Sequence, residues 1–217
     1  MKKIVAINAS PRVSWNTGTL VREAAKGAQA AGAEVEIFDL YKLDKFTGCV
    51  SCFGCKLPQH QGTCICKDGL TPVLEAIRGA DGLIIGTPNY LGDVSSAFRT
   101  LYERLVFPSV TYKIERQSYT ERLLPVLFIM TSGCPEALYA QVGYDKMLEK
   151  YQKSLNGAVG STKIMICSDT LQVDDYSKYE WTMFDPEAKK ERHEKVFPDD
   201  MKKAFALGTE MTENPWE

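Results

Sequence analysis

The sequence predicts an α/β protein built on a doubly wound, five-stranded parallel sheet. Strands that are covered on both faces have continuous apolar sequences, because neither face meets water. Four such runs occur, at IVAIN (4–8), GLIIG (82–86), LPVLFIM (124–130) and KIMIC (163–167). Amphipathic helical patterns separate these runs, so strands and helices alternate along the chain. This alternation implies parallel strands joined by right-handed crossovers.

The other elements follow from periodicity and from stop signals. EVEIFDL (34–40) alternates apolar and polar residues, which suits an edge strand. Gly32 supplies a stop for the first helix, and Thr71-Pro72 a start for the second. Helices are predicted over 18–31, 70–78, 94–106 and 136–156. Five strands favour the flavodoxin-like order 2-1-3-4-5 over a six-stranded dinucleotide-binding sheet.

We expect one domain over residues 1–168, followed by a carboxyl-terminal arm over 169–217 that is not a separate domain. The arm is polar, with one or two helical patterns, and it carries Trp181, Phe184 and Phe197. A solvated amphipathic arm and an arm that contacts another subunit are the two interpretations open for this segment. The loop at 41–68 is also longer than this fold requires, and long loops in compact domains usually have a function.

The composition is that of an ordinary globular domain. Of the 217 residues, 44 % are hydrophobic and 25 % charged, and the formal net charge is −2. This balance gives no support for binding to nucleic acid or to anionic membranes. No run approaches the roughly 20 apolar residues of a membrane span, and the first apolar run is too short for a signal peptide. We therefore expect a cytoplasmic protein without nucleic-acid or membrane partners.

The segment ASPRVSWNTGTL joins the first strand to the first helix. Ligands of doubly wound sheets bind at the carboxyl ends of the strands, beside the point where strand order reverses. The N–H groups of a helix N-terminus favour a phosphate at such a place. Arg12 adds positive charge, and hydrogen-bond donors are supplied by Ser10, Ser14, Asn16, Thr17 and Thr19. Neither a dinucleotide fingerprint nor a nucleoside-triphosphatase loop is present, and an ordinary capped turn is the alternative.

These residues carry a resemblance to a known family. NASPRVSWNTGTL resembles the S-P-R-x-x-S/G-N-T phosphate loop of NADPH-dependent FMN reductases and of flavodoxin-like iron–sulfur flavoproteins. Trp15 departs from the small residue that is usual at its position. GTPNYLGDVSSAFRTLYERL (86–105) is similar to the second signature of that family, and TSGCPE (131–136) sits where its third flavin loop should be. The resemblance spans residues 1–167 in order.

The resemblance implies a flavin-dependent oxidoreductase that uses FMN, with NAD(P)H or a ferredoxin-like protein as electron donor and a small molecule or protein as acceptor. It implies that the FMN phosphate is held by Ser10, Arg12, Asn16, Thr17 and Gly18. It places the ring and the ribityl chain against Pro88, Asn89, Tyr90, Leu91, Gly92 and Asp93, and the other ring edge against Thr131, Ser132 and Gly133. Hydride transfer to a flavin does not require an acid or base from the protein, so we expect no catalytic side chain.

Five of the seven cysteines lie in the long loop, in GCVSCFGCK (48–56) and just after it. A reducing compartment and an odd number of cysteines argue against a disulfide framework. An iron–sulfur cluster needs several thiolates in one small volume, and the family resembled carries a compact cysteine motif here. The resemblance implies a [4Fe–4S] cluster on Cys49, Cys52, Cys55 and Cys64, with Cys66 as the spare.

Other uses of these cysteines stay open at this point. They comprise Cys66 as the fourth ligand in place of Cys64, thiols without a cluster, a zinc site and a redox disulfide. Without the cluster, an NAD(P)H-dependent FMN or quinone reductase is expected. A non-enzymatic metal-binding or redox-sensing module is the alternative of another class.

Overall fold

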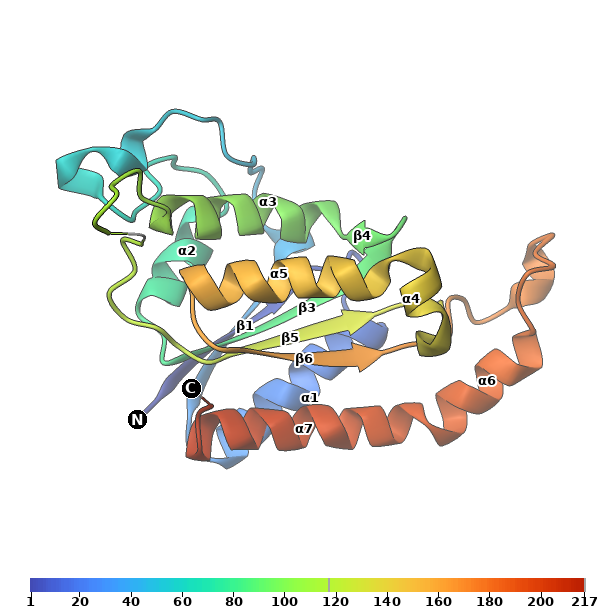
Figure 1. Ribbon diagram of the computed structural model, residues 1–217. Coiled ribbons are helices and arrows are strands. Elements are labelled where there is room, and N and C mark those ends of the chain that lie inside the picture. The colour runs from blue at the N-terminus through green and yellow to red at the C-terminus, as the bar shows by residue number, and fades with distance from the viewer. Residues whose placement is uncertain (117, 217) are drawn as a thin grey trace.

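The computed structural model describes residues 1–116 and 118–216 and has a parallel sheet with helices on both faces (Figure 1). The main strands are β1 (Lys3–Asn8), β2 (Glu34–Asp39), β3 (Gly82–Tyr90), β5 (Val126–Thr131) and β6 (Thr162–Cys167). They pair in parallel in the order β2-β1-β3-β5-β6, which confirms the order predicted from the sequence. A short strand, β4 (Asp93–Val94), which the sequence did not predict, pairs antiparallel with the end of β3.

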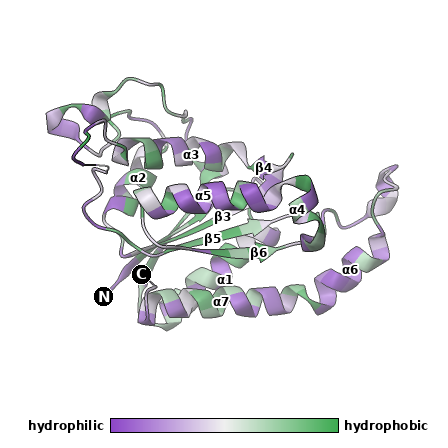
Figure 2. Cartoon of the chain, viewed as in Figure 1, coloured by the Kyte–Doolittle hydropathy of each residue, from purple (hydrophilic) through white to green (hydrophobic). Residues whose placement is uncertain are grey.

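Alternate residues of each central strand enter two separate cores. Val5 and Ile7 pack on the side of α2 (Thr71–Arg78), α3 (Ser96–Val106) and α5 (Tyr144–Ala158). Ile4 and Ala6 pack on the side of α1 (Asn16–Ala30) and α7 (Phe197–Glu213). Figure 2 shows green strands between helices with mixed faces. Burial on both faces is the reason that these strands read as unbroken apolar runs. Strand β2 is partly exposed and forms an edge, as its alternation predicts.

The helix predicted over residues 136–156 is wrong as a single element. A 3-10 turn over Glu136–Leu138 and the short helix α4 (Tyr139–Val142) come first, and α5 begins only at Tyr144. Between α4 and α5 lies Gly143, whose φ is +77°. This left-handed conformation suits glycine and ends a helix. The apolar periodicity continues across the break, so the pattern alone does not reveal it.

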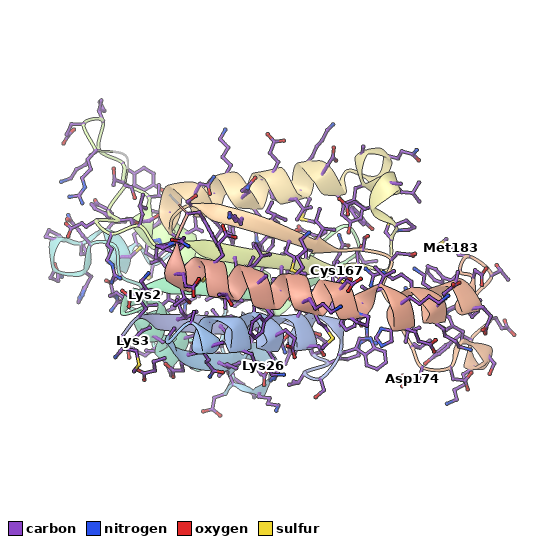
Figure 3. The ribbon with its side chains drawn as sticks, turned by 90° about the horizontal axis from the view of Figure 1, so that it is seen from below. Lys2, Lys3, Lys26, Cys167, Asp174 and Met183 are labelled. Carbon is purple, nitrogen blue, oxygen red and sulfur yellow. The ribbon has the colours of Figure 1, made fainter. Side chains whose placement is uncertain are left out.

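The last helix packs directly against the first. A Cβ atom at Gly208 would lie 1.9 Å from the carbonyl oxygen of Ala24, and one at Gly27 would lie 1.9 Å from that of Phe205. The two glycines therefore allow the backbones of α1 and α7 to touch. Figure 3 shows this pair from below, with Asp174 and Met183 on the segment that leads to α6 (Pro186–Lys195). Among the described helices, none combines the length and apolarity that a membrane crossing requires.

Candidate functional site

Three loops meet where strands β1, β3 and β5 end, and we call this region the loop end. It comprises residues 9–17, 87–95 and 131–135. The Oγ1 atoms of Thr17 and Thr131 lie 2.7 Å apart, which joins the first loop to the third. Ser95, the N-cap of α3, donates a 2.7 Å hydrogen bond to the carbonyl of Ala9, which joins the second loop to the first. The structure thus brings together the three segments that the sequence predicted to share a ligand.

Helix α1 begins in the first loop with no side-chain cap. Trp15 occupies the N-cap position without making a cap hydrogen bond, and the first turn holds no acidic residue. The first N–H groups of a helix have no acceptor inside the helix, and the dipole makes this end positive. A Cβ atom at Gly18 would lie 1.9 Å from the carbonyl oxygen of Val13, so only glycine lets the loop fold onto the helix this closely. This end of α1 suits a phosphate.

Several side chains of the first loop are tied to a distant segment at 171–172. The Nδ2 atom of Asn16 donates to the carbonyl of Leu171 at 2.8 Å, and the Trp15 indole donates to the same carbonyl at 3.2 Å. The Arg12 guanidinium donates to the carbonyl of Gln172. Both Arg12 and Asn16 thus have a protein partner already, and their contact with a phosphate stays a prediction. Ser10 and Thr17 are buried beside them.

The second loop turns sharply outward after β3. Leu91 has a φ of +55° and Gly92 one of +82°, and the Leu91 side chain is fully exposed. The amide of Gly92 donates to Oδ1 of Asn89 at 3.1 Å, which holds the turn. A left-handed leucine is uncommon outside strained, functional turns. Burial raises the pKa of Tyr90, and the opposing charge of Arg12 shows that its hydroxyl faces the first loop.

The third loop is fastened from two sides. The hydroxyls of Ser132 and Tyr139 lie 2.6 Å apart, and burial raises the pKa of Tyr139 to about 12, which keeps this phenol neutral. From α6, the ammonium of Lys189 donates to the carbonyl of Gly133 at 2.6 Å and pairs with Asp169. Its side chain is only 6 % exposed. Sequence reasoning missed Lys189, because it stands in the charged run EAKKER.

The loop end fits a phosphorylated flavin by the chemistry of its donors. An uncapped, positive helix end faces the place expected for the phosphate, and the left-handed turn at Leu91 and Gly92 exposes main chain beside Tyr90. Main-chain N–H groups at such a turn stabilise negative charge on a reduced ring. The described residues therefore offer one anchor for a phosphate and one surface for a planar ring.

The five loop cysteines line a single small cavity, and we call this region, residues 47–68 with the end of α3, the cysteine end. The cavity measures about 20 Å³ and is closed by Glu103, Arg104 and Phe107 of α3 and the turn after it. Burial raises the pKa of Cys55, Lys56 lowers it, and the thiols of Cys64 and Cys49 raise it further. Cys49, Cys55 and Cys64 therefore face the same cavity. Cys52 is exposed.

The donor set at the cysteine end has the chemistry of an iron–sulfur site, and its final geometry is not preformed. All seven cysteines are free thiols. Within residues 1–116 and 118–216, no three His, Cys, Asp or Glu side chains converge as a ready metal site. Between the cysteines, Ser51 and Phe53 hold left-handed φ values of 53° and 55°. Such strained residues concentrate at functional loops.

Arg104 of α3 clamps the cysteine end, and sequence reasoning missed it. Its buried guanidinium donates to the carbonyl of Thr47 at 3.1 Å, to that of Cys66 at 2.7 Å and to the carboxylate of Asp68. Burial lowers the pKa of Arg104, but the interactions with Asp68 and Cys64 raise it by more, so the group stays charged. Its Nε atom is buried without a hydrogen-bond partner in the described part of the chain.

The two ends are separated by the length of one helix. Helix α3 begins at Ser96 in the loop end and finishes at Val106 beside the cysteine cavity (Figure 1). Eleven residues at 1.5 Å each make about 16 Å of helix. One rigid element therefore fixes both regions relative to each other.

Comparisons with known proteins agree with this geometry. A sequence model of the NADPH-dependent FMN reductase family matches residues 2–142. Iron–sulfur flavoproteins of Methanocaldococcus jannaschii and Archaeoglobus fulgidus are each 36 % identical, over 102 and 104 residues, which is 47 % of this chain in both cases. The chain spans about half the length of the curated relatives it matches, at 51 % and 48 % of these two.

Two solved structures share the fold over nearly the whole chain. The NAD(P)H:quinone oxidoreductase from Methanothermobacter marburgensis has a TM-score of 0.71 at 15 % identity and covers 98 % of both chains. An FMN-dependent NADH-azoreductase from Bacillus anthracis, in complex with FMN, has a TM-score of 0.66 at 14 % identity and covers 98 % of this chain and 100 % of its own. At these identities the likeness establishes the fold.

Proposed function

The chain belongs to the NADPH-dependent FMN reductase family, and from that membership we propose that it is an FMN-dependent oxidoreductase. It takes electrons from NAD(P)H or a ferredoxin-like protein and passes them to a small-molecule or protein acceptor. The observation that carries this proposal is the meeting of three loops at the ends of β1, β3 and β5, with Thr17 and Thr131 in contact and α1 uncapped. When bound, FMN supplies the hydride-accepting chemistry and the conversion between two-electron and one-electron transfer.

The side chains of the loop end bind and orient the cofactor. The N–H groups of Asn16, Thr17 and Gly18, with the hydroxyl of Ser10, hold the phosphate. The turn from Pro88 to Asp93 supports the ring and the ribityl chain, and Thr131, Ser132 and Gly133 meet the other ring edge. The neutral phenol of Tyr139 fixes Ser132. No side chain needs to move a proton for hydride transfer, so positioning is the contribution of the chain.

At the cysteine end, Cys49, Cys52, Cys55 and Cys64 hold a [4Fe–4S] cluster in this proposal. The shared cavity supports it, as do the relatives named iron–sulfur flavoproteins. Cys64 is assigned as the fourth ligand because it follows Cys55 more closely in sequence than Cys66 does and lines the cavity with Cys49, Cys52 and Cys55. The carbonyl of Cys66, by contrast, is bound by Arg104. A bound cluster supplies one-electron transfer.

Anaerobic purification tests both parts of the proposal. A yellow protein from which FMN is released, and which NADPH or NADH reduces, supports the oxidoreductase. Iron and acid-labile sulfide near four of each per chain, with a brown shoulder that dithionite bleaches, support the cluster. Flavin without iron would favour the cluster-free FMN or quinone reductase. Colourless protein with stoichiometric zinc would overturn the proposal in favour of a non-enzymatic metal-binding or redox-sensing module.

The arm is proposed to join copies of this chain into a homodimer or homotetramer in the cytoplasm. Tyr179 and Trp181 stack with their ring centroids 4.4 Å apart, and both rings and Met183 are substantially exposed. Exposed aromatic groups on a projecting segment are typical of protein contacts. Light scattering of the wild type and of Trp181→Ser tests this assignment, since a smaller assembly is expected for the variant. An unchanged mass of the assembly would show that the arm is not part of the interface.

A further inference from the structure

A second and much larger cavity opens beside the cysteine end. It measures about 410 Å³ and is bounded by residues 61–64, α2, the end of α3, Arg116, residues 119–122, Leu124 and the end of α5. It lies on the side of the sheet where β5 begins, away from the loop end (Figure 1). Small-molecule sites typically measure 300–1,000 Å³. Neither the flavin nor the cluster of the proposed function occupies this space, although Cys64 forms part of its wall.

Positive charge dominates the wall of this cavity, which we call the arginine pocket. Its lining includes four guanidinium groups, from Arg78, Arg104, Arg116 and Arg122, and one carboxylate, from Glu121. The side chain of Arg78 makes no ion pair or hydrogen bond within the described part of the chain. The buried Nε of Arg104 also has no partner there. The Arg78 guanidinium therefore has donors free for a ligand, whereas the Arg104 guanidinium contributes its positive charge.

The other two arginines have ion-pair partners that are partly exposed, and the Nε of Arg116 also donates to the carbonyl of Ser118 at 2.8 Å. Arg116 and Glu121 are 3.5 Å apart, with side chains 44 % and 85 % exposed. Arg122 pairs with Asp81, with side chains 57 % and 34 % exposed. Exposed pairs of this kind contribute about 0–1 kcal/mol to stability. An incoming anion can therefore recruit both guanidinium groups at little cost.

The pocket also has an apolar floor. Leu74 and Ile77 of α2, Leu105 of α3 and Leu124 line it, and the ring of Tyr119 stands at its edge. A bare inorganic ion would leave this surface unused. Planar guanidinium forks match the oxygens of phosphates, and apolar and aromatic walls accept a planar organic group. The arginines and the apolar residues of this lining together suit an organic phosphate.

We propose that the arginine pocket binds a small organic phosphate of nucleotide size. The phosphate groups lie between Arg78, Arg116 and Arg122, and the organic part lies over Leu74, Ile77 and Tyr119. Because the pocket is remote from the loop end, this ligand binds alongside FMN and does not replace it. Because Cys64 lines the pocket, the ligand lies beside the cysteine end.

Titration calorimetry with ADP tests the proposal, on protein loaded with one equivalent of FMN and freed of unbound flavin. One ADP per chain is expected. The exposed variants Arg78→Gln and Arg122→Gln should each weaken ADP at least fivefold. The control Lys146→Gln, which removes the same charge at the far end of α5, should leave ADP binding unchanged. Pyrophosphate should bind more weakly than ADP, because it leaves the apolar floor bare.

Four outcomes would overturn the proposal. These are no ADP binding, equal losses in all three variants, release of the bound FMN by ADP, or citrate binding more tightly than ADP, which would assign the pocket to carboxylates. Circular dichroism of each variant checks that it is folded. The result does not depend on iron content or on reductase activity. A failure here is therefore distinguishable from a failure of the proposed oxidoreductase.

Discussion

The loop end and the cysteine end are held in place by different means. At the loop end, each segment leaves a buried strand and is linked to the next by short contacts, such as Thr17 to Thr131. At the cysteine end, the described chain between Lys42 and Thr71 contains only two 3-10 turns. It is held from outside by Arg104 and by Lys56, which donates to three carbonyls after α3. The fold positions the first site, whereas two long cations position the second.

The largest expected effect is the loss of the cluster from the cysteine end with the flavin still bound at the loop end. Cys55→Ser should abolish the iron and sulfide content while the bound FMN stays near its wild-type amount, because Cys55 is the buried thiol at the centre of the group. Metal analysis and flavin release on the same anaerobic sample measure both. Cys66→Ser is the matched control and should retain iron. Loss of FMN together with iron would show that the two ends are not independent.

A glycine substitution tests whether flavin binding can be weakened without loss of iron. Gly18→Ala places a Cβ atom 1.9 Å from the carbonyl oxygen of Val13, and overpacking of this kind costs about 1–3 kcal/mol. We expect FMN affinity to fall about tenfold, with iron content unchanged. Gly69→Ala, whose Cβ atom would lie 2.2 Å from the carbonyl oxygen of Asp44, should lower iron content and spare FMN. Fluorescence titration with FMN and iron analysis distinguish the two variants, and identical effects would contradict the comparison.

The third test removes the long cation that fastens the third loop, Lys189. Lys189→Met leaves the carbonyl of Gly133 and the carboxylate of Asp169 without their ammonium partner. Since Asp169 is partly exposed, the free energy of unfolding should fall by about 1–2 kcal/mol, less than for a fully buried pair. Urea unfolding measures this change. Lys190→Met, on the exposed neighbour, should change it little, and equal losses in the two variants would show that the contact with the third loop is unimportant.

The smallest expected effect concerns acid stability at the cysteine end. Burial alone would raise the pKa of Asp68, but hydrogen bonds from Arg104 and from the amides of Thr47 and Leu70 lower it overall. A lowered pKa contributes stability above the ordinary carboxyl pKa of about 4, and that contribution is lost as pH falls through the folded value. Asp68→Asn should therefore be less stable than wild type at pH 7, with the difference narrowing below pH 4. Parallel pH profiles from urea unfolding would argue against this role.

The sequence predicts the sheet and the position of each loop, because strand ends and helix starts follow from local patterns. The contacts that fasten the two sites are not local. Arg104 occupies an ordinary amphipathic helix and Lys189 a charged run. The sequence therefore predicts that both side chains are exposed to solvent, and only the packing of the elements shows that they are buried. The tie from Asn16 to Leu171 joins residues 155 positions apart. Likewise, β4 and the break at Gly143 depend on backbone conformations that apolar periodicity does not encode.

The contact between α1 and α7 has a consequence for the timing of cofactor capture. Thr209 donates to the carbonyl of Gly27 across 182 positions, and Gly208 lies against Ala24 on the same helix. The packing of α1, whose first turn is proposed to bind the flavin phosphate, is therefore completed only after α7 has been synthesised. Chain segments with such distant partners complete their folding late. We expect nascent chains that end before α7 to bind FMN poorly, so that flavin uptake follows synthesis.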